Sequence, residues 1–158
     1  MQLYTSSSKR GRENKIKVAV AMDIVTITLT LFFLFLAGVF DGVRDTLAFH
    51  YHRTRLPKDS LFWNPKHSWR NKYKNGDPDA GPRFPGSVTV FVWLTDAWHL
   101  FQFLFLGAFR LALLVLASEY IDLPWYAWAG LWLASAVPFN MGFHLIYTVI
   151  FYKGRGNA

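Results

Sequence analysis

Three long apolar stretches constrain the fold of this chain more than any other feature. The first, KVAVAMDIVTITLTLFFLFLAGVF, runs from Lys17 to Phe40 with Asp23 as its only internal charge, and the other two cover residues 87–117 and 125–152. Each stretch exceeds the roughly 20 residues that a helix needs to cross a bilayer. The first is also longer than the apolar core of a signal peptide, and no cleavage site of small residues follows it. We therefore expect an all-α integral membrane protein, a transmembrane bundle of three helices.

The segments between these stretches complete the expected organisation. In order, they predict a mobile basic tail at 1–17, a first membrane helix with a polar C-terminal end at 18–52, a long basic and aromatic loop at 53–86, a second helix at 87–117, a short acidic loop at 118–124, a third helix at 125–152 and a C-terminal tail at 153–158. Turn signals at residues 75–78 and 85–86 predict an irregular loop, with at most a short helix near residues 61–73. Pro138 should bend the third helix. Three spans place the two termini on opposite sides of the membrane.

Positive charge in this chain flanks the apolar stretches. The formal net charge is +7, and basic residues beside membrane spans set topology and attract anionic lipid. We therefore expect the lipid bilayer, including anionic lipids, as a partner and do not expect nucleic acid. The positive-inside rule favours a cytoplasmic long loop and C-terminus in a cell (inner) membrane, although the basic tail favours a cytoplasmic N-terminus instead. The chain has no cysteine, so it has no disulfide framework and no thiolate metal site.

Six ionisable residues within or next to the apolar stretches are predicted to gather in the half of the membrane nearest the long loop. They are Asp41, Asp45, His52, Asp96, His99 and His144. At about 1.5 Å per residue, Asp45, Asp96 and His144 each lie about 10 Å inside the loop-side end of a helix. Because a helix turns by about 100° per residue, the members on the first helix share one face, and so do Asp96 and His99 on the second.

Two spacings within this set suit a metal site. Asp96-x-x-His99 presents two ligands to a common point, as Glu-x-x-His does in helical di-iron bundles, and Asp41-x-x-x-Asp45 does so through the i, i+4 relation. His52 or His144 would complete a mixed nitrogen and oxygen shell suited to zinc, manganese or iron. An open coordination position would activate water. This interpretation predicts a metal-dependent membrane enzyme that acts on a lipid or a small molecule.

The same residues also fit an ionic seam without a metal. Arg44 can pair with Asp41, Asp45 or Asp96, because buried charges in membranes are normally paired. Such a seam fixes the register between helices and predicts a structural or accessory component of a homo- or hetero-oligomeric membrane assembly. We favour this interpretation because three helices seldom enclose a site unaided. The residue pattern leaves open whether the chain is an enzyme.

The far end of the first two helices offers a second ion pair. Asp23 and Arg110 are predicted to lie at a similar height, within reach of a long side chain. Thr26 and Thr30 on the same face as Asp23 can bond across the seam or to their own helix. A proton or ion pathway along this face is a third alternative, with few titratable steps between Asp23 and Asp41.

Basic and aromatic residues of the long loop are typical of a membrane interface. The predicted contacts to lipid headgroups are Lys66, Trp69, Arg70, Lys72 and Lys74. Aromatic rings suit the headgroup layer, and the cations attract anionic lipid. The segment fits either a simple anchor or a lid over the polar cluster, and both alternatives stay open.

Overall fold

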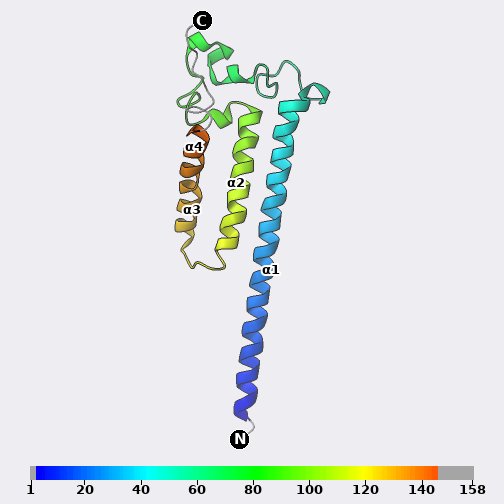
Figure 1. Ribbon diagram of the computed structural model, residues 1–158, viewed down its shortest axis with the longest axis vertical. Coiled ribbons are helices and arrows are strands. Elements are labelled where there is room, and N and C mark those ends of the chain that lie inside the picture. Colours follow the sequence, from blue (N-terminus) through cyan, green and yellow to red (C-terminus); the bar gives the residue numbers. More distant parts are fainter. Residues whose placement is uncertain (1–2, 146–158) are drawn as a thin grey trace. The chain divides into compact units, whose positions relative to one another are not determined.

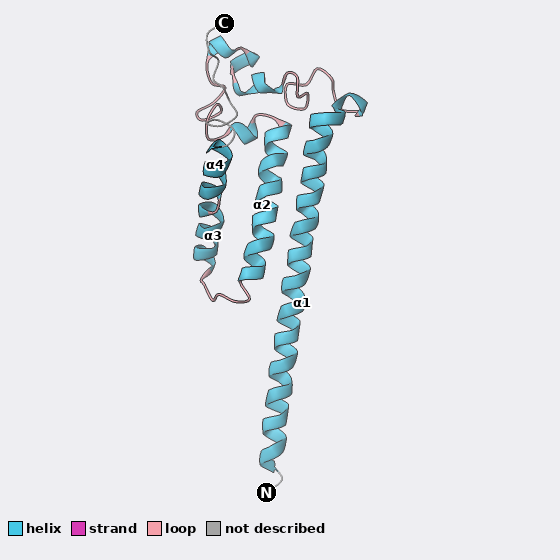
Figure 2. Ribbon diagram, in the orientation of Figure 1, coloured by secondary structure: helices cyan, strands magenta, loops and turns pink. Residues whose placement is uncertain are grey.

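The computed structural model describes residues 3–145, with the side chains of residues 24–142 and 145. Within this range the regular secondary structure is helical, and there is no strand, only an isolated bridge between Tyr73 and Pro82. The α-helices are α1 (Leu3–Asp45), α2 (Ala97–Ala117), α3 (Trp125–Ala134) and α4 (Ala136–His144) (Figures 1 and 2). Contacts divide the chain into two compact units. We call Thr28–Ala112 the loop unit, and Met1–Ile27 with Leu113–Ala158 the terminal unit.

Helix α1 ends close to the predicted residue. A π-helical turn, Thr46–His50, follows it directly, and a short 3₁₀ turn, Tyr51–Arg53, ends the helical run within one residue of the predicted end at His52. Its beginning differs from the prediction, since the helical backbone starts at Leu3 and includes most of the tail expected to be mobile. Residues 3–17 contain Lys, Arg and Glu, which are good helix formers, and no proline that would interrupt the helix.

Helix α2 begins ten residues later than the predicted second span. It starts at Ala97 and not at Ser87, because residues 85–91 form turns and Val92–Leu94 a short 3₁₀ helix instead. Gly86 has a φ of 83°, in the region that favours glycine, and its carbonyl oxygen accepts from Phe91 N at 2.8 Å. The 21 residues of α2 are about 31 Å long at 1.5 Å per residue, close to the thickness of a bilayer's hydrocarbon core. The helix is therefore long enough to span without the ten residues before it.

The core of the loop unit lies where the end of α1, the long loop and the start of α2 meet. Leu47, Tyr51 and Ala97 are buried there. Partly buried apolar side chains pack against them: Val43, Leu56, Phe62, Trp63, Trp98 and Phe101. Backbone contacts join the same parts, since Ala97 N donates to the carbonyl oxygen of Phe62 at 2.9 Å. The long loop is thus packed against both helices, and it is folded.

Turn chemistry shapes the rest of the long loop as predicted. Asn75 and Gly76 both have positive φ, 54° and 72°, and the side chain of Asp77 accepts from Asp79 N at 3.0 Å. A short 3₁₀ helix, Ser68–Lys72, lies within the region where a short helix was predicted. Side chains then tie this loop to the segment before α2. Asn71 Nδ2 donates to the carbonyl oxygen of Thr95 at 2.5 Å, and Ser87 Oγ donates to that of Lys72 at 2.8 Å.

The predicted third span is interrupted. Its described part forms two helices, α3 and α4, of 10 and 9 residues, with Ser135 between them. Pro138 lies three residues after this break and has no N–H to donate to the preceding turn, which accounts for the predicted bend. Neither helix alone reaches the roughly 20 residues of a span. Residues 146–152 of the predicted span lie outside the described residues.

Candidate functional site

Arg44, in the last turn of α1, joins α1 to α2. Its Nη2 lies 2.7 Å from Asp41 Oδ1 and 3.2 Å from Asp45 Oδ1. Its Nη1 donates to Gln102 Oε1 of α2 at 2.6 Å, and the guanidinium lies 5.4 Å from the ring centroid of Phe105. Both carboxylates that the spacing offered as metal ligands thus face a guanidinium. Gln102 did not figure among the predicted residues, although it is the only amide in α2.

Asp96 and His99 form the N-terminal cap of α2. Asp96 Oδ1 accepts from His99 N at 2.9 Å, and Oδ2 lies 2.6 Å from His99 Nδ1. The carboxylate is almost fully buried, while the side chain of His99 is 46% exposed. A carboxylate at this position satisfies a helix N–H that has no partner within the helix, and it interacts favourably with the positive end of the helix dipole. Asp96 therefore precedes the helix, and the prediction that it lies about 10 Å inside the span is wrong.

The six predicted metal ligands occupy separate settings among the residues that the structure describes. Asp41 and Asp45 contact Arg44, Asp96 contacts His99, and His52 is exposed in the 3₁₀ turn after α1. The side chain of His144 lies outside the described residues. Among the described side chains, no group of three or more His, Asp or Glu residues is placed to hold a metal ion. The later start of α2 explains the difference, because it removes Asp96 from the depth at which convergence was predicted.

The pair predicted at the far end involves Asp23, whose side chain lies outside the described ones. Within the terminal unit, Thr26 of the same helix donates through its hydroxyl to a carboxylate oxygen of Glu119, in the connection after α2. A polar contact from this face of α1 is therefore present, with a residue that the sequence pattern did not single out. Thr30, one turn further along, is buried.

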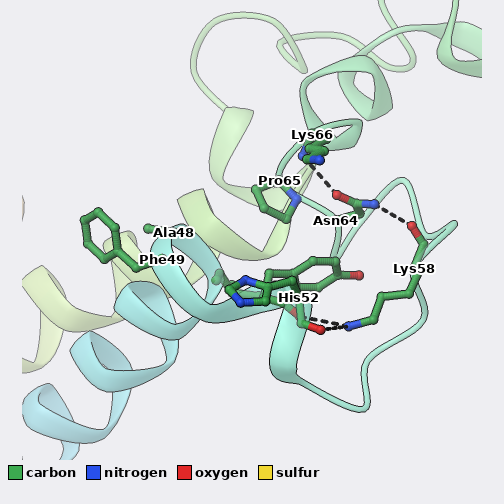
Figure 3. Close-up of a pocket in the computed structure, with 9 residues that line it drawn as sticks. Ala48, Phe49, His52, Lys58, Asn64, Pro65 and Lys66 are labelled. Carbon is green, nitrogen blue, oxygen red and sulfur yellow. Dashed lines mark hydrogen bonds between the residues drawn. The ribbon is translucent and has the colours of Figure 1, made fainter.

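A pocket of about 620 Å³ lies at the end of α1 in the loop unit (Figure 3). Its lining combines apolar and basic residues: Leu47, Ala48, Phe49, Tyr51, His52, Lys58, Asn64, Pro65 and Lys66. No Asp or Glu is among these nine. The pocket was not predicted, because its two walls, residues 47–52 and 58–66, come together only when the loop folds back on the helix end.

Lys58 and Asn64 shape this pocket. Lys58 Nζ donates to the carbonyl oxygens of Thr54 at 2.7 Å, Tyr51 at 2.8 Å and His52 at 3.4 Å, and it lies 4.7 Å from the ring centroid of Tyr51. It thus caps the carbonyl end of the helix, where a cation is favourable. Asn64 is buried, donates to the carbonyl oxygen of Lys58 and accepts from Lys66 N at 3.0 Å.

The remaining predicted headgroup contacts have different settings. Arg70 Nε donates to the carbonyl oxygen of Gly76 at 2.7 Å, so part of its side chain holds the loop. Trp69 is half exposed and meets the ring of Tyr73 edge to face, with Lys72 Nζ 5.5 Å from that ring's centroid. Lys74 is exposed. The loop therefore presents an aromatic pair and several cations at its surface.

Comparison with protein-family models, with curated proteins and with solved structures finds no match to this chain.

Proposed function

We propose that this chain is an integral membrane protein in which α1 and α2 cross the bilayer. The observation that carries the proposal is that both helices are long and apolar, yet only 17% of the most apolar window of each is buried within the structure. The core helix of a soluble protein would bury most of such a window. Large apolar side chains project outward instead, among them Phe35, 68% exposed, and Leu113, 53% exposed. Hydrocarbon is the environment that suits such a surface.

The polar side chains of the loop unit support an interfacial position for residues 53–96. The aromatic pair Trp69 and Tyr73, with nearby lysines, is typical of protein segments that lie in the headgroup layer. The 3₁₀ turns and the loop need water or internal partners for their backbone groups, which hydrocarbon does not supply. In this arrangement residues 53–96 cover one end of the spans and do not enter the apolar layer.

The role that fits this arrangement best is that of a structural or accessory component of a membrane assembly. The charged groups near the loop-side end are engaged in pairs: Arg44 contacts Asp41 and Asp45, and Asp96 caps α2. Such contacts fix the register and the ends of helices. They support a scaffold that holds α1 and α2 together and presents the loop at the surface. Self-association or a larger partner would cover the remaining helix faces.

Single-cysteine labelling tests the membrane arrangement, and the absence of native cysteine makes it direct. Asp79→Cys places a thiol in the exposed loop, and Tyr120→Cys places one at an 89% exposed site after α2. In sealed vesicles an impermeant maleimide should label one of these positions, and the other only after the membrane is opened. Equal labelling of both from one side, or release of the chain by alkaline carbonate, would contradict the proposal.

Crosslinking tests the accessory role. In native membranes, an amine- and thiol-reactive crosslinker on the Tyr120→Cys variant should trap a defined product larger than the monomer. The same variant in dilute detergent is the control for random collision. A chain that stays monomeric in the membrane at native abundance would argue against an assembly.

A further inference from the structure

We propose that the pocket at the end of α1 binds the phosphate of an anionic phospholipid, with the acyl chains lying along the adjacent apolar surface of α1. This inference rests on the proposed membrane function. It assigns a ligand class to the pocket and gives His52 and Lys66 the role of binding that ligand directly. Specific binding of this kind differs from the general electrostatic attraction between the basic loop and an anionic bilayer.

Charge within the pocket favours an anion. Its lining has two lysines and a histidine but no carboxylate. Helix C-termini ordinarily repel anions, because the unpaired carbonyl groups carry partial negative charge. Here the ammonium of Lys58 donates to the carbonyl oxygens of Tyr51, His52 and Thr54, and its positive charge offsets the partial negative charge at this end of the helix. An anion is therefore accommodated next to a helix end that would otherwise exclude it.

Two side chains are available to bind the anion directly. The three N–H groups of Lys58 are matched by its three carbonyl partners. Lys58 therefore contributes positive charge to the pocket but few hydrogen-bond donors to a bound anion. Lys66 and His52 are exposed, and within the described part of the chain neither the ammonium of Lys66 nor the imidazole of His52 has a hydrogen bond or an ion pair. An ammonium and an imidazole N–H are both good donors to a phosphate oxygen. Asn64 holds the backbone of Lys58 and Lys66 in place around this space.

The apolar part of the lining favours a lipid over a soluble phosphate. Leu47, Ala48 and Phe49 belong to the π-helical turn, which lies within the candidate span Ile24–Arg53. Leu47 is buried in the core, so Ala48 and Phe49 form the accessible part of this apolar wall. The side chain of Phe49 is 69% exposed beside the pocket. A phosphate ion or a small phosphate ester has no apolar surface to bury against this wall. The glycerol backbone and the first methylene groups of a phospholipid do have such surface, and its burial is favourable. The combination of donors and apolar wall thus matches a headgroup still attached to its chains.

Native mass spectrometry of the full chain in detergent tests this assignment. The probes are dioleoyl phosphatidic acid, dioleoyl phosphatidylcholine of no net charge, and soluble glycerol 3-phosphate. The native chain should retain phosphatidic acid in preference to phosphatidylcholine. The double variant His52→Gln/Lys66→Gln should lower the retained fraction by about tenfold, since two charge-assisted contacts are lost.

Arg55→Gln is the matched control, because Arg55 is an exposed cation of the same loop that does not line the pocket. It should change retention of phosphatidic acid by less than about twofold, as expected for an exposed charge. Unchanged retention in the double variant, or equal loss in Arg55→Gln, would overturn the pocket assignment. Binding of glycerol 3-phosphate as tight as that of phosphatidic acid would reassign the site to a soluble phosphate.

Membrane retention separates the two proposals. Circular dichroism and the melting temperature of each variant establish that it is folded before binding is compared. A chain that stays in carbonate-washed membranes but shows no effect of the double variant disproves only the lipid site. A chain that carbonate releases disproves the membrane function, and the lipid site with it.

Discussion

Arg44 and Gln102 face each other across α1 and α2, with Nη1 of the arginine 2.6 Å from Oε1 of the glutamine. The side chain of Arg44 is 23% exposed. Its guanidinium also contacts two carboxylates of its own helix, and Gln102 is its hydrogen-bond partner on α2. A neutral amide there accepts from the cation without adding a further charge to a helix that is apolar over most of its length. The contact sets which turn of α2 lies beside the end of α1.

Replacing Gln102 by leucine should destabilise the contact between α1 and α2. The substitution removes an acceptor for a charged donor, a loss of about 1.5–3 kcal/mol. Reversible unfolding in mixed micelles measures the change in the free energy of unfolding. Gln102→Glu is the control, because it keeps an acceptor for Arg44. If Gln102→Leu were as stable as the native chain, the contact would be incidental.

Removing Arg44 should be more costly than removing Gln102. Arg44→Leu removes the bond to Gln102 and also leaves Asp41 and Asp45 without their cation. Because the side chains of these two aspartates are 37% and 54% exposed, each lost ion pair adds at most about 1 kcal/mol. Adding Asp41→Asn and Asp45→Asn to the same chain should recover much of this loss. A double-mutant cycle of unfolding free energies measures the coupling. Strict additivity of the three substitutions would show that these residues act independently.

Asp96→Ala should fray the start of α2. Loss of an N-cap costs about 1 kcal/mol, and Asp96→Ser should restore most of it because a hydroxyl also accepts from the helix N–H. Amide hydrogen exchange of residues 97–100 reports on this turn directly. His99→Ala keeps the contact from its own backbone N–H to Asp96 and should have the smaller effect. Equal protection in Asp96→Ala and the native chain would argue against the cap.

Metal analysis decides between the structural interpretation and a metal-dependent enzyme. Under the structural interpretation, the detergent-purified chain should contain no stoichiometric zinc, manganese or iron, and an Asp96→Asn/His99→Ala variant should match it. Elemental analysis of both, with helicity and melting temperature as controls, is the measurement. Stoichiometric metal in the native chain that is lost in the variant would favour the enzyme, with His144 and the aspartates examined next as ligands.

Orientation follows from the basic residues of the loop. We expect Asp79→Cys to be protected from an impermeant maleimide in intact cells and labelled after lysis, which places the loop in the cytoplasm. Asn157→Cys should behave in the same way if the third apolar stretch crosses the membrane. Labelling of Asp79→Cys in intact cells would reverse the orientation. Opposite behaviour of the two cysteines would show that the third stretch does not span.

Local sequence patterns predicted the features of this fold that local chemistry determines. The end of the first helix near His52 follows from hydropathy and periodicity, the turn at Asn75 and Gly76 from their tolerance of positive φ, and the bend before the end of the third stretch from Pro138. Each of these depends on one residue type or on one continuous pattern.

Features that depend on contacts between distant residues were not predictable in this way. Hydropathy assigned residues 87–96 to the second helix. It does not indicate that Asp96 is the N-cap residue of that helix, or that the segment before Asp96 forms hydrogen bonds with the long loop. The same error in the helix start made Asp96 appear deep. Gln102 was passed over since a lone amide in an apolar run has no fixed meaning until its partner is known.

If α1 crosses the bilayer as proposed, the cap that Lys58 places on its end also bears on how the protein responds to bilayer thickness. Carbonyl groups at the end of a membrane helix ordinarily depend on water for hydrogen bonds. Here a side chain from the loop supplies donors to the carbonyl oxygens of Tyr51 and His52, so these groups stay satisfied when hydrocarbon advances toward them. The end of α1 should therefore keep those bonds at different depths in the bilayer. This lowers the free-energy cost of hydrophobic mismatch and reduces the need for the helix to tilt.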